Sequence, residues 1–391
     1  MSDPAGRLNI QLRRVASGFA CQIGSTRPVA SSALFRGRGM TETASLLPLL
    51  FSICARSQAL ACAGALERAG GMKPDPGTAH LRRMVVAVET VREHLWRILL
   101  DWPAILGEEP DRQAMIRVQA IARDVFAAAD PDGALFRPGS ETPIPSPDVL
   151  AGTASSLANL MAERILGMSP DVWLERVENL AAFDDWCRSV STPSARLLRG
   201  LLDSGEGRFG HAEICALSDP ADSELASELR GPQAAEFVAR PSWRGLPRET
   251  TPLTRYAESG LTAALVADQG RGILARLVAQ VVETASLIQR VRGGGSGAQL
   301  AVVQDGALEA GVGIGRADAA RGLLVHLAEV DGTRVLDYRI LAPTEWNFHP
   351  KGVVAKALAA LPDAEDSVLS RRAQLLVTAI DPCVAFDLVL P

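Results

Sequence analysis

The chain has 391 residues, of which 47% are apolar and 22% are charged, and its formal net charge is −5. These values are typical of a globular protein with a large core. No part of the chain is strongly basic, so we do not expect it to bind nucleic acid. The N-terminal segment lacks the apolar core of a secretory signal. The most apolar run, 46–53, is far shorter than the roughly 20 residues of a membrane span. We therefore expect a cytoplasmic protein that does not insert into a membrane.

The first elements in the chain combine strands with a buried helix. Residues 7–37 alternate between polar and apolar side chains, which predicts two or three short strands. Residues 41–69 are apolar or small and end at Gly70-Gly71, as expected for a buried helix with a glycine stop. The chain therefore opens with a small β-rich part.

The middle of the chain, 41–292, is predicted to form a helical core. Apolar residues recur at spacings of three and four from Met84 to Ile98, which places them on one helix face. Further helical segments are expected near 111–129, 146–167, 171–201 and 258–292. Residues 203–253 are mixed and rich in turns.

The last part, 298–391, is predicted to contain a hairpin and two helices. It follows a glycine-rich connector, 293–297. Apolar runs at 323–330 and 335–341 flank Asp331-Gly332, a strong hairpin signal. The helices are expected at 351–361 and 366–379. The fold class is therefore α+β, mainly α, in a single domain over 1–391 with a small N-terminal sheet and a C-terminal β-hairpin.

Generic enzyme motifs do not identify an activity. The sequence has no GxSxG, HExxH or convincing GxGxxG, and its five histidines are not paired at metal-ligand spacing. Six cysteines are scattered without a CxxC pair, so a disulfide framework is not expected. Such cysteines are usually small buried apolar residues. The cysteines are Cys21, Cys54, Cys62, Cys187, Cys215 and Cys383.

Three segments, in this order, carry a specific resemblance. They are FSICARSQALA at 51–61, ARGLLVH at 320–326 leading to APTEWNFHP at 342–350, and Asp381-Pro382-Cys383. Together they resemble the large subunit of nickel-iron hydrogenases, with its CGxC, PRGxxxH, VPxTWN-like and DPCxxC motifs. The resemblance runs from about residue 7 to 391 and implies a large-subunit-like helical core.

The resemblance implies four metal-binding thiolates, of which this chain keeps two. Cys54 matches the second, bridging cysteine of the first motif, and Phe51 stands at the first position. A competing register would place Cys54 on that first position. Cys383 takes the nickel-only position of the last motif, and Phe386 replaces its bridging partner. A thiolate-rich site without half of its ligands should not hold two metals, so we expect no stable nickel-iron centre.

The residues that hold the diatomic ligands of the iron match the resemblance. The family's arginine and hydroxyl residue, which donate hydrogen bonds to the two cyanides, correspond to Arg321 and Thr344. Asp381 before Pro382 is typical of a helix start, which would place the Cys383 thiol near a helix N-terminus. Arg321 as a salt-bridge partner and Thr344 as a turn hydroxyl remain open alternatives.

Two departures argue against hydrogen turnover. The family's proton-relaying glutamate has no match in residues 7–11, and no histidine that marks a precursor cleavage site follows Cys383. Cys54 and Cys383 could also be a core cysteine and a remnant without a ligand role. Cys62, His94 and His326 are expected to be structural.

The resemblance extends to the HupK/HoxV group of hydrogenase accessory proteins, which implies a non-enzymatic maturation scaffold. The expected cargo is a transient Fe(CN)2(CO) fragment without nickel, held by Cys54 and Cys383 as metal ligands. The expected partners are a HypC-type chaperone, a HypD-type iron carrier and the hydrogenase large-subunit precursor. The alternatives are a true or sensory nickel-iron hydrogenase large subunit, and a metal-free module that binds the chaperones.

Overall fold

The computed structural model describes residues 6–16, 18–27, 29–51, 53–141, 147–293 and 308–390. Seventeen helices and six strands are assigned in this part of the chain. The first helices are α1 (Met40–Leu46), α2 (Ala55–Ala69), α3 (Pro76–Trp96), α4 (Trp102–Ile105), α5 (Arg112–Ala129) and α6 (Pro147–Met161). They are followed by α7 (Pro170–Arg176), α8 (Leu180–Ser189), α9 (Pro193–Asp203), α10 (Asp222–Arg230), α11 (Ala234–Ala239) and α12 (Pro252–Arg255). The last helices are α13 (Gly260–Gln269), α14 (Ile273–Arg292), α15 (Pro343–Asn347), α16 (Val353–Ala359) and α17 (Asp366–Ile380).

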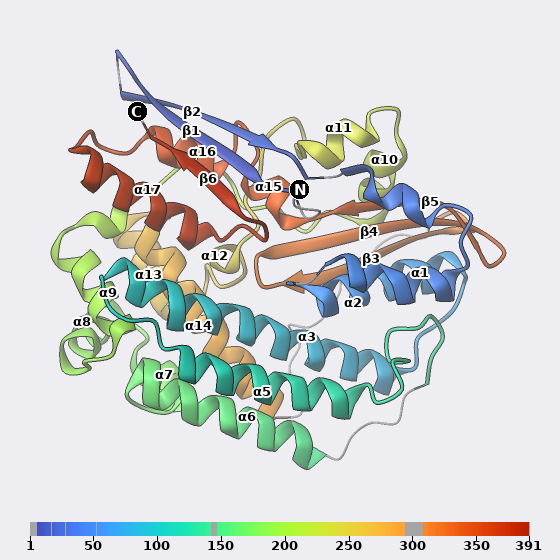
Figure 1. Ribbon diagram of the computed structural model, residues 1–391, viewed down its shortest axis with the longest axis horizontal. Helices are drawn as coiled ribbons and strands as arrows, with labels where there is room; N and C mark the ends of the chain where they lie inside the picture. The colour runs from blue at the N-terminus through green and yellow to red at the C-terminus, as the bar shows by residue number, and fades with distance from the viewer. Residues whose placement is uncertain are drawn as a thin grey trace.

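The strands form two separate three-stranded sheets. One has the order β2-β1-β6 and the other the order β3-β4-β5. The strands are β1 (Leu8–Val15), β2 (Gly18–Ser25), β3 (Val312–Ala319), β4 (Gly322–Asp331), β5 (Arg334–Leu341) and β6 (Phe386–Val389). In Figure 1 the first sheet lies at the top and the second at the right, while long helices including α3, α14, α5 and α6 fill the lower part. The mainly helical α+β fold is therefore confirmed.

The N-terminal sheet joins the two ends of the chain. Of the two or three strands expected in 7–37, two form, β1 and β2; they pair antiparallel, with Leu8 opposite Ser25. The third strand was not expected, because β6 comes from the chain end and pairs with β1 in parallel, Leu8 opposite Phe386. Four residues carry too short a pattern to predict a strand, and here the long-range pairing decides.

The C-terminal sheet contains one strand more than the predicted hairpin. The hairpin around Asp331-Gly332 is confirmed as β4 and β5. Strand β3 pairs antiparallel with β4 and was missed. Its sequence, VGIGRADA, contains two glycines, which are unfavourable in strands. A β-carbon on Gly315 would lie 1.8 Å from the carbonyl oxygen of Ala61 in α2, so the close approach of the helix requires this residue.

Several predicted helices are broken in the structure. The stretch 41–69 is not one helix: α1 is followed by a 3-10 turn, Leu47–Leu50, and α2 begins at Ala55. The stretch 258–292 divides into α13 and α14 at Gly270, and 171–201 divides into α7, α8 and α9. The expected helices at 351–361 and 366–379 correspond to α16 and α17. Of the glycine connector, Gly293 follows α14 and the rest lies outside the described residues.

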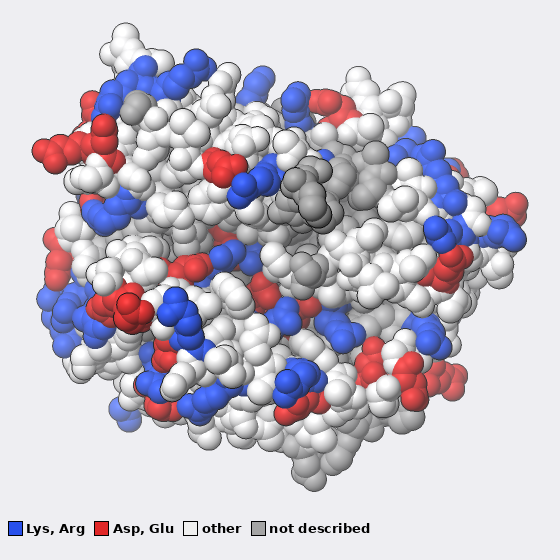
Figure 2. Space-filling model, viewed as in Figure 1, with Lys and Arg blue, Asp and Glu red and all other residues white. Residues whose placement is uncertain are grey.

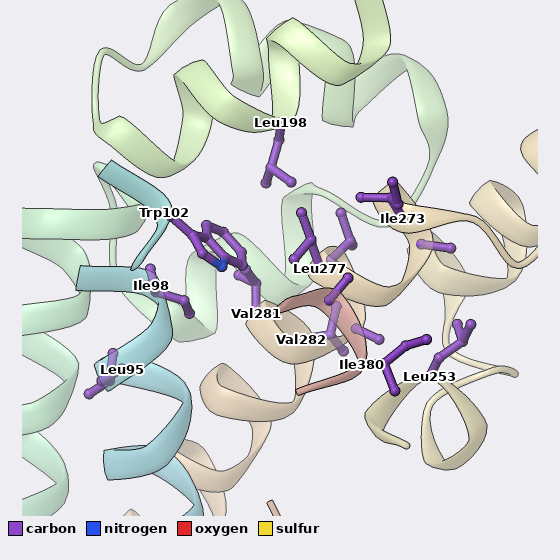
Figure 3. Packing of buried hydrophobic residues seen from close by; sticks show 14 of the residues in the cluster. Leu95, Ile98, Trp102, Leu198, Leu253, Ile273, Leu277, Val281, Val282 and Ile380 are labelled. Atoms are coloured by element: carbon purple, nitrogen blue, oxygen red, sulfur yellow. The ribbon is translucent and has the colours of Figure 1, made fainter. Parts of the chain in front are cut away.

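The main core forms around α14. Figure 3 shows Trp102 against Ile98 and Val281, with Ile380 of α17 on the far side of α14. The Trp102 side chain is fully buried. None of the described helices is long and apolar enough to cross a membrane. Acidic and basic side chains are interspersed over the face in Figure 2.

Candidate functional site

The first thiol of the candidate site lies at the start of α2. Cys54 is the N-cap residue, and its carbonyl oxygen accepts the N–H of Gln58 at 2.9 Å. The Glu89 carboxylate of α3 caps the same helix end, since it accepts the backbone N–H groups of Arg56 and Ser57, both at 2.8 Å. These bonds fix Cys54 between two packed helices.

A buried chain of side chains holds the first thiol. The Gln58 amide nitrogen lies 3.8 Å from the Cys54 sulfur and can donate to it. The Gln58 oxygen then faces His326 Nε2 at 2.9 Å, and His326 Nδ1 faces the Tyr338 hydroxyl at 2.8 Å. Burial lowers the pKa of His326 to about 3, so the ring is neutral at pH 7. In this arrangement Nε2–H donates to Gln58 and Nδ1 accepts from Tyr338.

The second thiol does not lie at a helix N-terminus, so that prediction was wrong. Asp381 ends α17 instead of opening a helix, with a left-handed φ of 62° and its N–H donated to Val377 at 2.8 Å. Its carboxylate binds arginine side chains and caps no helix. Pro382 then turns the chain away from the helix, and Cys383 lies in the bend before β6.

Thr344, which the resemblance predicts to donate to a cyanide, contacts the second thiol in the structure. Its Oγ1 lies 3.0 Å from the Cys383 sulfur and 3.4 Å from the Cys383 backbone N–H. Thr344 is buried in the short helix α15, which follows β5. The hydroxyl thus fixes both the backbone and the side chain of Cys383.

The two thiols share one electrostatic environment although 329 positions separate them in the sequence (383 − 54). The pKa of Cys54 is raised to about 12, chiefly by burial, then by the negative charge of Cys383 and by Glu89. The Arg321 guanidinium acts in the opposite direction. The structure therefore brings Cys54, Cys383, Thr344 and Arg321 together. These four side chains thus line one site.

Arg321 is held by two buried carboxylates. Its Nη1 donates to Glu93 at 2.9 Å, and its Nε lies 3.1 Å from Asp381 Oδ2. Arg97 binds the same Asp381 at 2.7 Å. The salt-bridge alternative for Arg321 is therefore realised, and its Nε faces the Asp381 carboxylate.

The backbone around Arg321 is fixed by a tight corner. Asn347 Nδ2 donates to the carbonyl oxygens of Arg321 at 3.0 Å and Thr250 at 2.7 Å. Gly322 has a φ of 132°, and a β-carbon there would lie 2.1 Å from the Thr250 carbonyl oxygen. Only glycine fits this position, which explains why it follows the arginine.

A second arginine in the site was missed by sequence reasoning. Arg27 follows β2 and pairs with Glu345 at 3.0 Å, with both side chains largely buried. Burial lowers the pKa of Arg27, but the negative charges of Cys383, Glu345 and Cys54 raise it by more, so the pKa is raised overall. A hydrogen bond to Cys383 acts in the same direction. The sequence shows an arginine just after an alternating strand, which is a weak indication of a functional residue. The sequence does not show that the end of this strand lies near Cys383.

The two positions that lack thiols are occupied by packing residues. Phe51 packs against the cluster that includes Leu47 and Cys62, and Phe386 packs against the main core. Cys62 is fully buried, eight residues along α2 from Cys54 and so about 12 Å away. Among the described residues no three His, Cys, Asp or Glu side chains form a group that could hold a metal ion. The thiols that the described structure places in this site are those of Cys54 and Cys383.

A cavity gives access to the second thiol. Its volume is about 600 Å³, and Cys383 lies in its wall together with Ile53, Arg97 and Phe386. Cys383 is half-buried, whereas Thr344 behind it is buried. A small group or a partner's side chain can thus reach the sulfur from this side.

Known proteins of similar sequence are hydrogenase expression/formation proteins. The chain is 31% identical over 383 residues to HoxV of Cupriavidus necator, covering 93% of this chain and 91% of the relative. It is 31% identical to HupV of Azotobacter chroococcum mcd 1, with 98% of each chain covered. The chain belongs to the HoxV/HupV/HupK family. HupK of Azotobacter vinelandii is 29% identical over 395 residues. No family model matches the sequence.

Solved structures with the same fold are hydrogenases. The nickel-iron-selenium hydrogenase of Desulfomicrobium baculatum superposes with a TM-score of 0.67 at 14% identity, over 95% of each chain. An NAD+-reducing [NiFe]-hydrogenase gives a TM-score of 0.61 at 17% identity, over 94% of this chain and 92% of the other. This HoxV/HupV/HupK relative therefore has the hydrogenase large-subunit fold.

Proposed function

We propose that this protein is a scaffold for hydrogenase maturation that transiently holds an iron fragment with two cyanides and one carbon monoxide. Cys54 and Cys383 would bind the iron, and the protein would pass the fragment to the precursor of a nickel-iron hydrogenase large subunit. The observation that carries this proposal is the meeting of two thiols in one buried site, beside Arg321 and Thr344.

The polar groups of the site suit such a fragment. Cyanide nitrogens accept hydrogen bonds well, and the Arg321 guanidinium that would donate to them is held in the site by Glu93 and Asp381. An iron(II) ion with two cyanides is neutral, so binding it to two thiolates leaves two negative charges. Arg27 and Arg321, both close to Cys383, would attract these charges. They would offset the charges only in part, because Glu345, Glu93 and Asp381 already pair with the two arginines. Burial of the complex then costs less free energy.

Two thiolates suit a carrier better than a permanent site. A fragment that is bound by few protein ligands can be transferred, whereas four thiolates would retain it. The phenylalanines at 51 and 386 remove the other two ligand positions without opening the core. A protein of this kind would not turn over hydrogen, and no nickel is expected in it.

The partners follow from the role. The relatives are named as hydrogenase expression/formation proteins, and interaction with the maturation machinery agrees with that. We propose that a HypC-type chaperone and a HypD-type iron carrier deliver the fragment, in the cytoplasm, and that the large-subunit precursor receives it.

Infrared spectroscopy on anaerobically purified protein tests the proposal. The protein should be co-produced with the maturation machinery and analysed for metals in parallel. Cyanide and carbonyl stretching bands with iron and without nickel support the scaffold. Bands with stoichiometric nickel would instead indicate a true or sensory hydrogenase, and the absence of bands would favour a metal-free module that binds the chaperones.

Substitution of the thiols tests the ligand assignment. Cys54→Ala and Cys383→Ala should each abolish the infrared bands and lower hydrogenase activity in cells, while the melting temperature stays close to that of the wild type. Cys215→Ala is the matched control, since this thiol is exposed and lies outside the site. Normal loading and maturation in both site variants would contradict the assignment.

A further inference from the structure

A second polar cavity is lined by α2, α3, α14, β3 and the end of α12, and neither Cys54 nor Cys383 is among its lining residues. Its volume is about 200 Å³. This volume is below the range of about 300 to 1,000 Å³ that drug-sized ligands occupy. It has room for several water molecules or for one ligand of amino-acid size.

One wall of the cavity presents an unsatisfied donor. Arg255 binds Glu283 with two hydrogen bonds of 2.7 Å, and Glu283 also contacts His94 at 2.8 Å. The third guanidinium nitrogen, Nη1, is buried without a hydrogen-bond partner in the described structure. A buried charged donor without a partner is unfavourable by itself. A ligand in the cavity would satisfy it.

Two further charged groups of opposite sign line the cavity without forming ion pairs. No hydrogen bond or ion pair joins Arg83 or Asp318 to another described residue. Asp318 is exposed to solvent on one side; the surrounding protein raises its pKa, and the positive charge of Arg255 lowers it. Arg290, the remaining cation of the lining, lies beside Tyr256 and hydrogen-bonds it.

The combination of charges selects the ligand. A simple anion would be repelled by Asp318 and Glu283, and a simple cation would be repelled by three arginines. We infer that this cavity binds a small zwitterion of α-amino-acid size, with its carboxylate on Arg255 and Arg83 and its ammonium group on Asp318. The walls between these groups are apolar, formed by Leu60, Val86, Ala87, Leu287 and Ala317. A short aliphatic side chain would fit against them.

Calorimetric titration of the full-length protein tests the inference. The probes are L-alanine, L-valine and L-leucine, together with propionate and ethylamine, which each lack one of the two charged groups. At least one amino acid should bind saturably in the millimolar range or tighter. Propionate and ethylamine should bind about tenfold more weakly or not at all, because each leaves one charged group of the cavity unpaired.

Matched variants distinguish this cavity from other surfaces. Arg83→Met and Asp318→Asn remove groups that have no ion pair in the described structure, so both should fold normally by circular dichroism. Each should weaken amino-acid binding by about tenfold or more. Arg112→Met, at an exposed arginine, should leave it unchanged. The absence of saturable binding by all three amino acids, or binding that survives both cavity substitutions, would overturn the inference. Neither result bears on the iron-fragment proposal.

Discussion

At the scale of single residues, the candidate site is a balance between two thiols and two arginines. Arg321 is placed by Glu93 and Asp381, and Arg27 is placed by Glu345. These carboxylates hold the guanidinium groups in a site where burial disfavours uncompensated charge. Burial, with the negative charges of Cys383 and Glu89, raises the pKa of Cys54 to about 12, and Arg321 acts in the opposite direction.

Substitution of Arg27 should impair the site without destroying the fold. Arg27→Met alone would leave Glu345 buried without a partner, so the informative variant is Arg27→Met/Glu345→Gln. We expect it to keep a melting temperature near that of the wild type and to load about tenfold less iron fragment, because one charge-assisted hydrogen bond is lost. Infrared band intensity per protein is the measurement. A control at the exposed Arg36 should load normally, and full loading in the double variant would exclude a role for Arg27.

His326 predicts a pH dependence of stability. Its pKa falls from 6.5 in the unfolded chain to about 3 in the folded protein. As the pH falls below 6.5, His326 is protonated in the unfolded chain but not in the folded protein. Protonation therefore favours the unfolded state, and the protein becomes less stable. Between pH 7 and pH 5 this one group should lower the free energy of unfolding by about 2 kcal/mol. Urea unfolding at both values, compared with His326→Gln, measures it. An equal loss in the variant would show that His326 is not the cause.

At the scale of elements, the packing of α2 on β3 positions the first thiol. The helix carries alanines and a glycine on this face, and the strand has Gly313 and Gly315 opposite them. The backbones thus approach so closely that no side chain fits between them. The N-terminus of α2, and with it Cys54, is fixed relative to the sheet that carries Arg321 at its edge.

An alanine at position 315 should therefore separate the helix from the strand. Its β-carbon would lie 1.8 Å from the Ala61 carbonyl oxygen. Because this oxygen belongs to the backbone, the clash can be relieved only by moving the helix or the strand. We expect Gly315→Ala to destabilise the protein by about 3 kcal/mol or more. Gly152→Ala is the control, because nothing lies near this exposed helical glycine, and it should stabilise by about 0.5 to 1 kcal/mol. Denaturant unfolding decides, and similar values for the two variants would refute the packing argument.

At the scale of the whole molecule, the site depends on the meeting of the chain ends. Strand β6 begins at Phe386, shortly after Cys383, and pairs with β1, the first strand in the sequence. Thr344 then contacts Cys383 from the segment between β5 and α16. The second thiol is consequently placed only when the two ends of the chain have come together.

Removal of residues 386–391 should release the second thiol. The parallel pairing of Phe386 to Val389 with β1 would be lost, so the segment around Cys383 would become mobile. We expect a lower melting temperature and faster alkylation of Cys383, measured by mass spectrometry of the labelled peptide. Removal of Pro391 alone should change neither. Unchanged alkylation after the larger deletion would mean that β6 does not hold the thiol.

The sequence by itself determined the helical core, the first strand pair, the β4–β5 hairpin and the residues of the site that stand in recognisable motifs. Helix periodicity, alternation and the Asp-Gly turn are local signals, so they can be read without the fold. Cys54, Cys383, Arg321 and Thr344 are identified differently, because their segments, such as Asp-Pro-Cys, resemble motifs of nickel-iron hydrogenase large subunits.

Only the tertiary structure decided the rest. The Asp-Pro pair predicted a helix start, but the Arg97 and Arg321 side chains bind Asp381 and the helix ends there. Strand β3 was hidden by glycines that a neighbouring helix requires. Arg27 joined the site because β2 lies near the chain end in space. Each of these features depends on contacts between distant segments, and a local pattern carries no information on them.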